Sequence, residues 1–453
     1  MHKRVSILLL LVMVIPVLLS ACGGAAPTVA PQPAATSAPE TTAPEATKAP
    51  PAQPVKVIYL SAGTAEVEQD WNEKWVKAFN DSHPNIQIQY ELVAWADLLT
   101  KVSAMIAGGN PPDIAWYAPS MIKEWYYGGL LEPLDDWLPQ DIEELLPAIR
   151  DPSASDIIYD GKYYGMPFCL AGLGVIARKD IFAEAGYDTD DLMNWDWAKY
   201  KEIMAAVTKP DKNQYGLQFA FGEPRISGGK YWFLTNGLRD VTDFSNKEAY
   251  VEALQYSMDL FPYSPEAQLQ WVHADTLTCY MNGVCSVAFQ GSYFQGDIIR
   301  QAPEVMSNEG SAVLPYPIGP RMDDCMVPWY TVGWVMFQAS RNKPEAAEVL
   351  HFLASREAVN EWPMNMAPKT EITLEDRVRA SEFGEEVRWW LEDWYEMMEI
   401  CKPAARPGYA PSNEINQIYT EVLLELYYGS ITAEEAYEQL KAGIEPIVIA
   451  PGQ

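Results

Sequence analysis

Short apolar segments alternate with amphipathic segments along most of this chain of 453 residues. Apolar runs of four to eight residues are typical of strands, and apolar residues three or four positions apart are typical of helices. The predicted strands are residues 55–60, 86–90 and 114–116, and Trp71 and Trp75 mark the inner face of the helix after the first strand. Strand and helix in turn predict an α/β fold in which helices flank a largely parallel sheet.

The same alternation restarts in the second half of the chain. Further strands are predicted at residues 175–177, 284–289 and 312–317. Ser245 with Glu248, and Thr432 with Glu435, have the spacing of a capping box, so a helix is predicted to begin at each pair. A second α/β lobe is therefore expected after the first.

The N-terminal region has a different pattern. An apolar run at residues 5–19 follows Lys3 and Arg4, and its length suits a secretory signal rather than a bilayer span. It ends in Leu-Ser-Ala-Cys, which resembles the processing site of bacterial lipoproteins, where the thiol of Cys22 is lipidated and residues 1–21 are removed. Residues 22–54 are rich in Pro, Ala and Thr and cannot form a core. We therefore expect an extracytoplasmic protein that a lipid and a Pro/Ala/Thr-rich linker tether to the cell membrane.

Composition excludes several classes of function. The 62 acidic residues against 32 Lys and Arg give a formal net charge of −30, which repels the phosphates of nucleic acids. The four histidines are scattered, and no metal or nucleotide motif occurs in a suitable context, so neither a metal nor another cofactor is expected. With 16 Trp and 25 Tyr, the chain has more aromatic residues than packing alone usually needs. Some rings are therefore expected to face a ligand.

Five cysteines follow the predicted lipidation site. Cys279 and Cys285 flank the turn-like residues 281–283 and are the best candidates for a disulfide in an oxidising compartment. The odd number leaves at least one thiol free if all pairing is internal.

Several stretches in series resemble the extracellular solute-binding proteins of family 1, which serve ABC importers and are related to maltose-binding protein. The matching stretches are residues 107–114 (AGGNPPDI), 131–134 (LEPL), 160–168 (DGKYYGMPF), 178–182 (RKDIF), 281–283 (MNG) and 345–347 (EAA). Each is short, but they occur in the family's order across nearly the whole chain after the linker.

The resemblance implies a two-lobed fold of the type II periplasmic-binding-protein class. Residues 55–167 and 314–362 are expected to form lobe 1, and residues 168–313 and 363–453 to form lobe 2. A sugar or oligosaccharide would lie in the cleft between the lobes, and the closed, monomeric receptor would deliver it to the permease subunits of an ABC importer. No bond is broken in this function, so no catalytic residue and no enzyme activity are expected.

The sugar site needs flat rings and a few fixed polar groups, as concave binding sites usually have. Residues that follow predicted strands, or lie where the chain passes between lobes, are the candidates. The aromatic candidates are Trp116, Tyr117, Phe168, Trp232, Tyr293, Trp329, Tyr330 and Trp334. Gly291 and Ser292 are candidates because they follow a strand of the second lobe. Gly333 is expected to let backbone approach the ligand, and Glu66 and Glu68 to accept hydroxyl protons.

Other readings stay open at this point. The same fold would bind ferric ion through tyrosine pairs (Tyr126-Tyr127 and Tyr163-Tyr164), a polyamine through acidic groups, or a phosphorylated sugar through Arg225, Lys230 and Arg406. An exported glycoside hydrolase would also carry a lipid anchor and tryptophans, but it needs two carboxylates across the scissile bond. Asp135-Asp136 and Glu143-Glu144 are adjacent pairs, which are typical of solvated surfaces.

Overall fold

The computed structural model describes residues 53–63, 66–152, 155–219, 221, 229–362, 365–405 and 411–448. Residues 52–453 form one compact unit by their contacts. The predicted signal, Cys22 and almost all of the linker lie outside the described residues, as do Arg225 and Arg406. Within the described part of the chain, no helix combines the length and apolar character needed to cross a membrane.

One eight-stranded sheet organises the folded chain, and a separate hairpin of two short strands lies beside it. Its path runs β2-β1-β3-β9-β6-β7, with β10 paired to β9 and β8 paired to β6. The strands are β1 (Val55–Ala62), β2 (Ile86–Val93), β3 (Ile114–Tyr117), β6 (Met166–Arg178), β7 (Val287–Gly291), β8 (Ser311–Leu314), β9 (Met326–Met336) and β10 (Lys402–Ala405), and the hairpin is β4 (Ile158–Tyr159) with β5 (Lys162–Tyr163). The predicted α/β class is confirmed. The sheet is mixed rather than largely parallel, because β3 pairs antiparallel with β9, and β6 pairs antiparallel with β7, β8 and β9.

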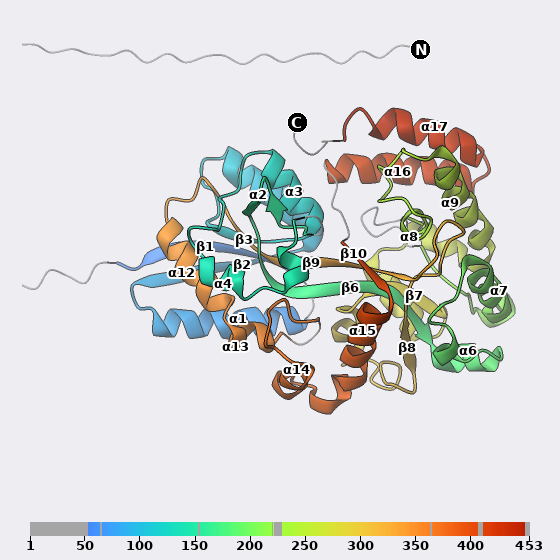
Figure 1. Ribbon diagram of the computed structural model, residues 1–453, viewed down its shortest axis with the longest axis horizontal. Helices are drawn as coiled ribbons and strands as arrows, with labels where there is room; N and C mark the ends of the chain where they lie inside the picture. The colour runs from blue at the N-terminus through green and yellow to red at the C-terminus, as the bar shows by residue number, and fades with distance from the viewer. Residues whose placement is uncertain are drawn as a thin grey trace, which may run out of the picture. The chain divides into compact units, whose positions relative to one another are not determined.

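Two long strands, β6 and β9, belong to both halves of the sheet (Figure 1). The first part of β6 pairs with β9, from Met166 opposite Trp334 to Gly172 opposite Trp329. From Leu173 onward β6 pairs with β7 and β8 instead. β9 pairs with β10 at its beginning and with β3 at its end. The two strands therefore carry the chain between the two groups of elements.

The first group surrounds β1, β2 and β3, which are mutually parallel. Its helices are α1 (Glu66–Ser82), α2 (Trp95–Ala107), α3 (Pro119–Tyr127), α4 (Pro139–Glu143), α5 (Pro147–Arg150), α12 (Lys343–Leu353) and α13 (Arg356–Asn360). Helix α1 buries Trp71, Trp75 and Phe79 on one face, as the spacing predicts. Glu66 and Glu68 lie in its first turn, where the positive end of the helix dipole stabilises their negative charge.

The second group surrounds the end of β6 with β7 and β8 (Figure 1). Its helices are α6 (Lys179–Glu184), α7 (Trp197–Val207), α8 (Tyr231–Thr235), α9 (Lys247–Leu260), α10 (His273–Met281), α11 (Phe294–Ile298), α14 (Leu374–Ala380), α15 (Arg388–Ile400), α16 (Ser412–Tyr427) and α17 (Ala433–Ile444). Short 3-10 turns are η1 (Thr189–Asp191), η2 (Pro210–Lys212), η3 (Phe261–Tyr263), η4 (Glu266–Gln270) and η5 (Gly384–Val387).

Helix beginnings follow the predicted capping chemistry with one correction. Thr432 and Glu435 form the capping box of α17. Helix α9 is capped by Asn246, whose side chain accepts from the Ala249 amide, rather than by Ser245. Asparagine is as good an N-cap as serine. The sequence alone therefore does not decide whether Ser245 or Asn246 begins the helix.

The predicted lobe boundaries stay predictions. Met366, close to the third predicted passage between the lobes, bridges Leu170 of β6. Residues 318–319, assigned to lobe 1 from the sequence, bond elements of the second group: Ile318 bridges Asp196, and the Gly319 amide donates to the Thr235 carbonyl.

Two disulfides are present in the second group. Cys279 and Cys285, the pair singled out from the sequence, are joined at the end of α10. Cys325 and Cys401 form a second bridge between the start of β9 and the start of β10, and Cys169 is a buried free thiol. Residues 325 and 401 are far apart in the sequence, so spacing alone gave no signal for this pair.

Candidate functional site

The carboxyl ends of β1, β2 and β3 meet at one edge of the sheet. Because these strands are parallel and Ala62 lies opposite Val93, the residues after them are neighbours in space. Gly63 follows β1 with φ +119°, and a Cβ placed on it would lie 2.0 Å from the Glu68 carboxylate. Half-buried Glu68 thus lies against the end of β1, as the sequence predicts, and Trp95 follows β2 directly.

Most of the predicted ring candidates of the first group form an aromatic core at this edge. The Phe168 ring centroid lies 4.7 Å from Trp116, 5.0 Å from Trp334 and 4.6 Å from Trp362. All four side chains are almost fully buried, and Tyr117 is buried with its hydroxyl 2.7 Å from the Thr331 hydroxyl. In the conformation described, other side chains cover these rings, which form the floor behind the strand ends.

The Trp95 ring extends this aromatic core toward the surface. Its centroid lies 5.8 Å from that of Trp116, and its side chain is only half-buried. The sequence interpretation missed Trp95 because it falls on the first residue of α2, where it reads as part of a helical stripe. Its position directly after a strand was the signal that could have found it.

The second group places its candidates around the end of β7. Half-buried Tyr293 donates from its hydroxyl to Gln290 Oε1 at 3.0 Å, and its ring packs against Gly291, where a Cβ would be 2.5 Å from it. Trp232 is 1 % exposed and packs edge-on to Tyr256 and Phe289. Tyr293 therefore lies near the surface, whereas Trp232 belongs to the core of this group.

The Ser292 hydroxyl is hydrogen-bonded to Asn365, close to the third predicted passage between the lobes. Ser292 is fully buried, its hydroxyl accepts from Asn365 Nδ2 at 2.8 Å, and its carbonyl accepts from Trp390 Nε1. Asn365 Oδ1 in turn accepts from Trp362 Nε1 at 2.8 Å. This set of bonds joins Trp362 and Asn365 to the end of β7.

On β9, Trp329 and Tyr330 are at most 9 % exposed. Gly333 lies so close to β6 that a Cβ would be 2.1 Å from the Met166 carbonyl oxygen. Gly333 thus allows a close backbone approach, but the backbone that it approaches is that of β6.

An ion-pair cluster joins the two groups near the start of α1. Arg300 of the second group lies 2.8 Å from the Glu66 carboxylate, 3.4 Å from Asp70 and 2.8 Å from Glu382. The Glu66 side chain is 74 % exposed, so this contact is screened by solvent and contributes little to stability. Sequence reasoning missed Arg300, because nothing in its surroundings along the chain points to α1.

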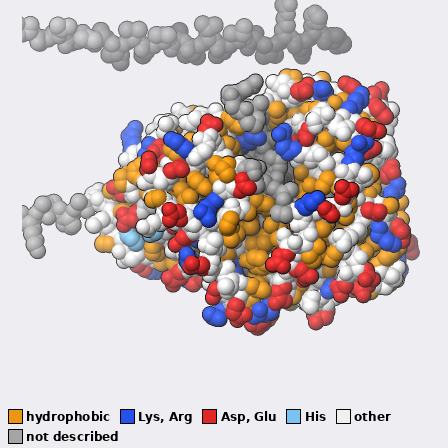
Figure 2. Space-filling view, viewed as in Figure 1, with side chains coloured by type: hydrophobic (Ala, Val, Ile, Leu, Met, Phe, Trp, Pro, Cys, Tyr) orange, Lys and Arg blue, Asp and Glu red, His pale blue; other side chains and the backbone are white. Residues whose placement is uncertain are grey.

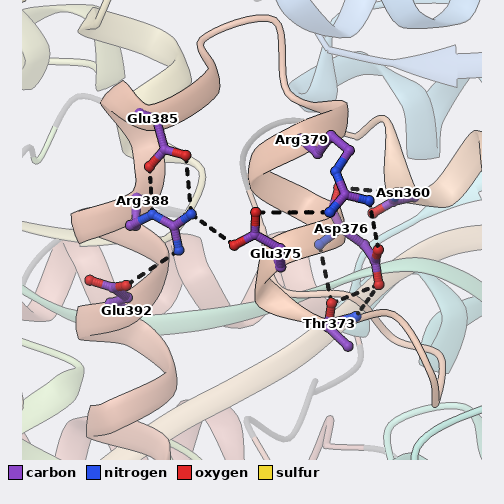
Figure 3. A network of polar contacts seen from close by, with 8 residues as sticks. All are labelled: Asn360, Thr373, Glu375, Asp376, Arg379, Glu385, Arg388 and Glu392. Atoms are coloured by element: carbon purple, nitrogen blue, oxygen red, sulfur yellow. Dashed lines mark hydrogen bonds and ion pairs between the residues drawn. The ribbon is translucent and has the colours of Figure 1, made fainter.

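A second polar network holds α14 and α15 together (Figure 3). Arg388 contacts Glu375, Glu385 and Glu392, and so joins α14, η5 and α15. Thr373 and Asp376 form the capping box that begins α14. These bonds position α15, which carries Trp390, and the segment between α14 and η5 that contains Glu382.

The tyrosine pairs considered for ferric ion lie partly together. The Tyr126 ring stacks on Tyr159 at 4.3 Å and meets the edges of Tyr127 and Tyr164 at 5.3 and 4.9 Å. Burial, and then the hydrogen bond to Asp160, raises the pKa of the Tyr126 hydroxyl, which opposes phenolate formation. Among the described residues, no group of three or more His, Cys, Asp or Glu side chains could hold a metal.

The carboxylates considered for a hydrolase are engaged in structural contacts. Burial raises the pKa of Glu144, but hydrogen bonds and charge from Lys369 and Arg356 outweigh it, and the net shift is downward. A general acid needs the opposite shift. Asp135 accepts from the Tyr163 amide at 3.1 Å. Lys230, considered for a phosphorylated sugar, is buried and donates to Asn416 at 2.6 Å.

Hydrophobic side chains are exposed near the middle of the face that Figure 2 shows. Figure 2 shows hydrophobic side chains gathered there and acidic side chains spread more widely toward the edges. An apolar area bordered by polar groups is typical of small-molecule sites.

Comparison with known proteins gives a consistent picture. A family model described as bacterial extracellular solute-binding protein matches residues 62–360. A putative binding protein of Brucella abortus is 25% identical over 295 residues, covering 63% of this chain and 68% of the relative. A maltotriose-binding protein of Pyrococcus abyssi is 28% identical over 156 residues, covering 33% of this chain and 31% of the relative.

Solved structures are similar over most of the folded chain. An ABC substrate-binding protein from Listeria monocytogenes in complex with cycloalternan has a TM-score of 0.70 at 19% identity, covering 87% of this chain and 98% of that one. Maltose-bound T. maritima MalE3 has a TM-score of 0.69 at 18% identity, covering 86% and 99%. At these identities the similarity concerns the fold.

Proposed function

Because the chain belongs to the bacterial extracellular solute-binding proteins and has their two-lobed α/β fold, we propose that it captures a sugar or oligosaccharide between its lobes. The observation that carries the proposal is the arrangement at the strand ends. Trp95 extends a buried aromatic floor to the surface, and Glu68 lies against Gly63 at the same edge. Relatives named for maltotriose and mannitol binding, and a similar structure with mannotriose bound, support a carbohydrate ligand.

The chemistry of a sugar suits these groups. Its C–H face packs on the Trp95 ring, and its hydroxyls donate to the carboxylates of Glu66 and Glu68. Tyr293 supplies a ring and a hydroxyl from the other lobe. The buried rings predicted as contacts, among them Trp116, Phe168 and Trp334, act by holding Trp95 and the crossing strands in place.

Binding favours the conformation in which both lobes touch the ligand, because only that conformation desolvates it from two sides. β6 and β9 are shared by both groups, so they are the strands that bend when the lobes move. The closed receptor then docks on an ABC importer as a monomer, without cofactor or catalysis.

Replacing Trp95 by alanine is expected to weaken glycan binding about 10- to 100-fold, since one stacking ring and its buried area are lost. Isothermal titration of the purified protein with a panel of malto-, manno- and xylo-oligosaccharides and sugar alcohols measures the effect. The matched control is W137A. Trp137 is also half-buried, and its Nε1 donates to the Glu132 carboxylate. The Glu132 amide donates to the carbonyl of Met336, which lies opposite Ile114 at the beginning of β3. Trp137 therefore lies near the opposite end of the parallel strands from Trp95. Equal losses in the two variants, or no heat with any glycan, would contradict the proposal.

We also propose that Cys22 is lipidated and anchors the protein to the cell membrane. The support is the sequence pattern Leu19-Ser20-Ala21-Cys22 together with the extracellular family to which the folded part belongs. Expression with an alkyne-tagged fatty acid is expected to label the full chain, and C22S is expected to abolish the label. Label that persists in C22S would refute this anchor.

A further inference from the structure

A buried carboxyl lies against the strand that joins the two lobes. Asp156 precedes β4 in the first group and is 8 % exposed. Its Oδ2 accepts from the Thr331 amide at 2.8 Å, and its Oδ1 accepts from the Thr331 hydroxyl at 2.7 Å. Thr331 lies in the part of β9 that pairs with β6, opposite Leu170. Asp156 therefore braces lobe 1 against a crossing strand at two points.

The side chains next to this carboxyl are uncharged, and the buried Arg377 acts on one of them, the Cys169 thiol, where it partly offsets the rise in pKa that burial causes. Tyr117 at the end of β3 lies beyond the Thr331 hydroxyl, Tyr159 of β4 donates to the Asp156 carbonyl at 3.2 Å, and the Cys169 thiol of β6 is nearby. No Lys or Arg in the described part of the chain pairs with Asp156. Burial, only partly offset by the bonds from Thr331, raises the pKa of Asp156 to about 6.

The protonation state of Asp156 sets the direction of a hydrogen-bond chain. When the carboxyl is ionised it only accepts, so the single proton of the Thr331 hydroxyl goes to Asp156 and Tyr117 donates to Thr331. When it is protonated on Oδ1, it donates to Thr331, and Thr331 then donates to Tyr117. The Thr331 amide bond to Oδ2 is retained in both states. Both states thus bond Thr331, but only the ionised state buries a charge without a counter-charge.

We propose that Asp156 is a positioning residue for ligand binding, which braces β9 through Thr331 and whose protonation favours the lobe arrangement described here. This inference rests on the proposed function, because it concerns the conformation that binds the ligand. When β9 bends at Thr331, the hydrogen bonds between Asp156 and Thr331 break and water reaches the carboxyl. The braced conformation therefore holds a proton that the bent conformation releases, and ligand binding takes up a proton.

The sign of the pH dependence follows from the upward shift. Below about pH 4 the carboxyl is protonated in both conformations, and above about pH 6 it is ionised in both, with the burial cost complete. Affinity is therefore expected to rise as the pH falls from 7.5 to 5, by up to about tenfold if the bent conformation fully hydrates Asp156.

The test compares wild type with D156N. An asparagine amide accepts from the Thr331 amide and donates to the Thr331 hydroxyl, and so imitates the protonated acid. D156N is expected to bind the glycan at pH 7.5 as tightly as wild type binds at pH 5, with no change between the two values. A tenfold dependence that persists in D156N would overturn the proposal.

D393N is the matched control. Asp393 on α15 also has its pKa raised to about 6 by burial, but it accepts from the Val313 amide within lobe 2. D393N is expected to change how the melting temperature depends on pH and to leave the pH dependence of affinity as in wild type. Loss of that dependence in D393N as well as in D156N would assign it to general stability and refute the brace.

Two measurements without ligand separate this inference from the proposed function. Carboxyl-carbon NMR of the full protein is expected to show Asp156 titrating near pH 6, and an ordinary value near 4 would refute the inference. Small-angle scattering is expected to show a more compact wild-type protein at pH 5 than at pH 7.5, and no such change in D156N. If these results hold while no glycan binds, the sugar proposal fails and the proton-sensitive brace stands.

Discussion

A G333V variant is expected to lose its folded structure, because residue 333 has no room for a side chain. A Cβ on this residue would be 2.1 Å from the Met166 carbonyl oxygen and 2.5 Å from Pro167 Cα. Both are backbone atoms of β6, and β9 lies between β3 and β6 in the middle of the sheet, so no side-chain rotation relieves the clash. Overpacking in cores usually costs about 1–3 kcal/mol, and a backbone clash in a central strand is expected to exceed that range.

Near-ultraviolet circular dichroism and urea unfolding measure the effect. G333A tests the same clash with the smallest side chain and is expected to lower the free energy of unfolding by more than about 3 kcal/mol. G109A is the control, since Gly109 has φ +73° and no atom within 4 Å of its added Cβ. Its expected cost is about 1 kcal/mol, from the left-handed backbone alone. If G333A were no worse than G109A, the close approach of β9 to β6 would be wrong.

The folding pattern was predictable where the periodicity was local. Trp71, Trp75 and Phe79 on α1 needed only their own spacing. β1 and β3 were short apolar runs, and β2 showed the alternation of a half-buried strand. The strand β6 was not recognised at its full length, Met166–Arg178, because it is buried almost throughout and contains two glycines. The alternating pattern of a half-exposed strand is absent from such a segment. The sequence therefore indicated two lobes but not the strands that they share.

The candidate site was predictable only in part. The strand-end rule led to one edge of the sheet, where the structure places Glu68, Trp116 and Tyr117 together. It did not tell which rings are covered, because burial of Trp116 depends on Phe168 and Trp362, which approach from distant parts of the chain. The same limit applies to Arg300, whose contacts with Glu66 cross between lobes. Long-range contacts of this kind have no local sequence signal.

The attachment of β9 to β10 limits where β9 can bend. Lys402 lies opposite Met326, and the adjacent cysteines Cys325 and Cys401 are bonded to each other. The bridge therefore fixes β9 to lobe 2 just before it crosses, while Asp156 holds Thr331 from lobe 1. The disulfide stays closed when β9 bends, whereas the hydrogen bonds between Asp156 and Thr331 can open, so the bend is expected at Thr331.

Removal of the Cys325–Cys401 bridge, by changing both residues to serine, is expected to destabilise the protein by about 4 kcal/mol. The bond closes a loop of 76 residues that holds α12 to α15, and loop-closure entropy in the unfolded chain grows with loop length. The matched control is the double serine variant of Cys279 and Cys285, a loop of only 6 residues with an expected cost of about 2 kcal/mol. Urea unfolding of both variants and of the oxidised wild type gives the three free energies. Equal losses, or a larger loss from the short loop, would show that local strain or packing rather than loop length decides the contribution of these bonds.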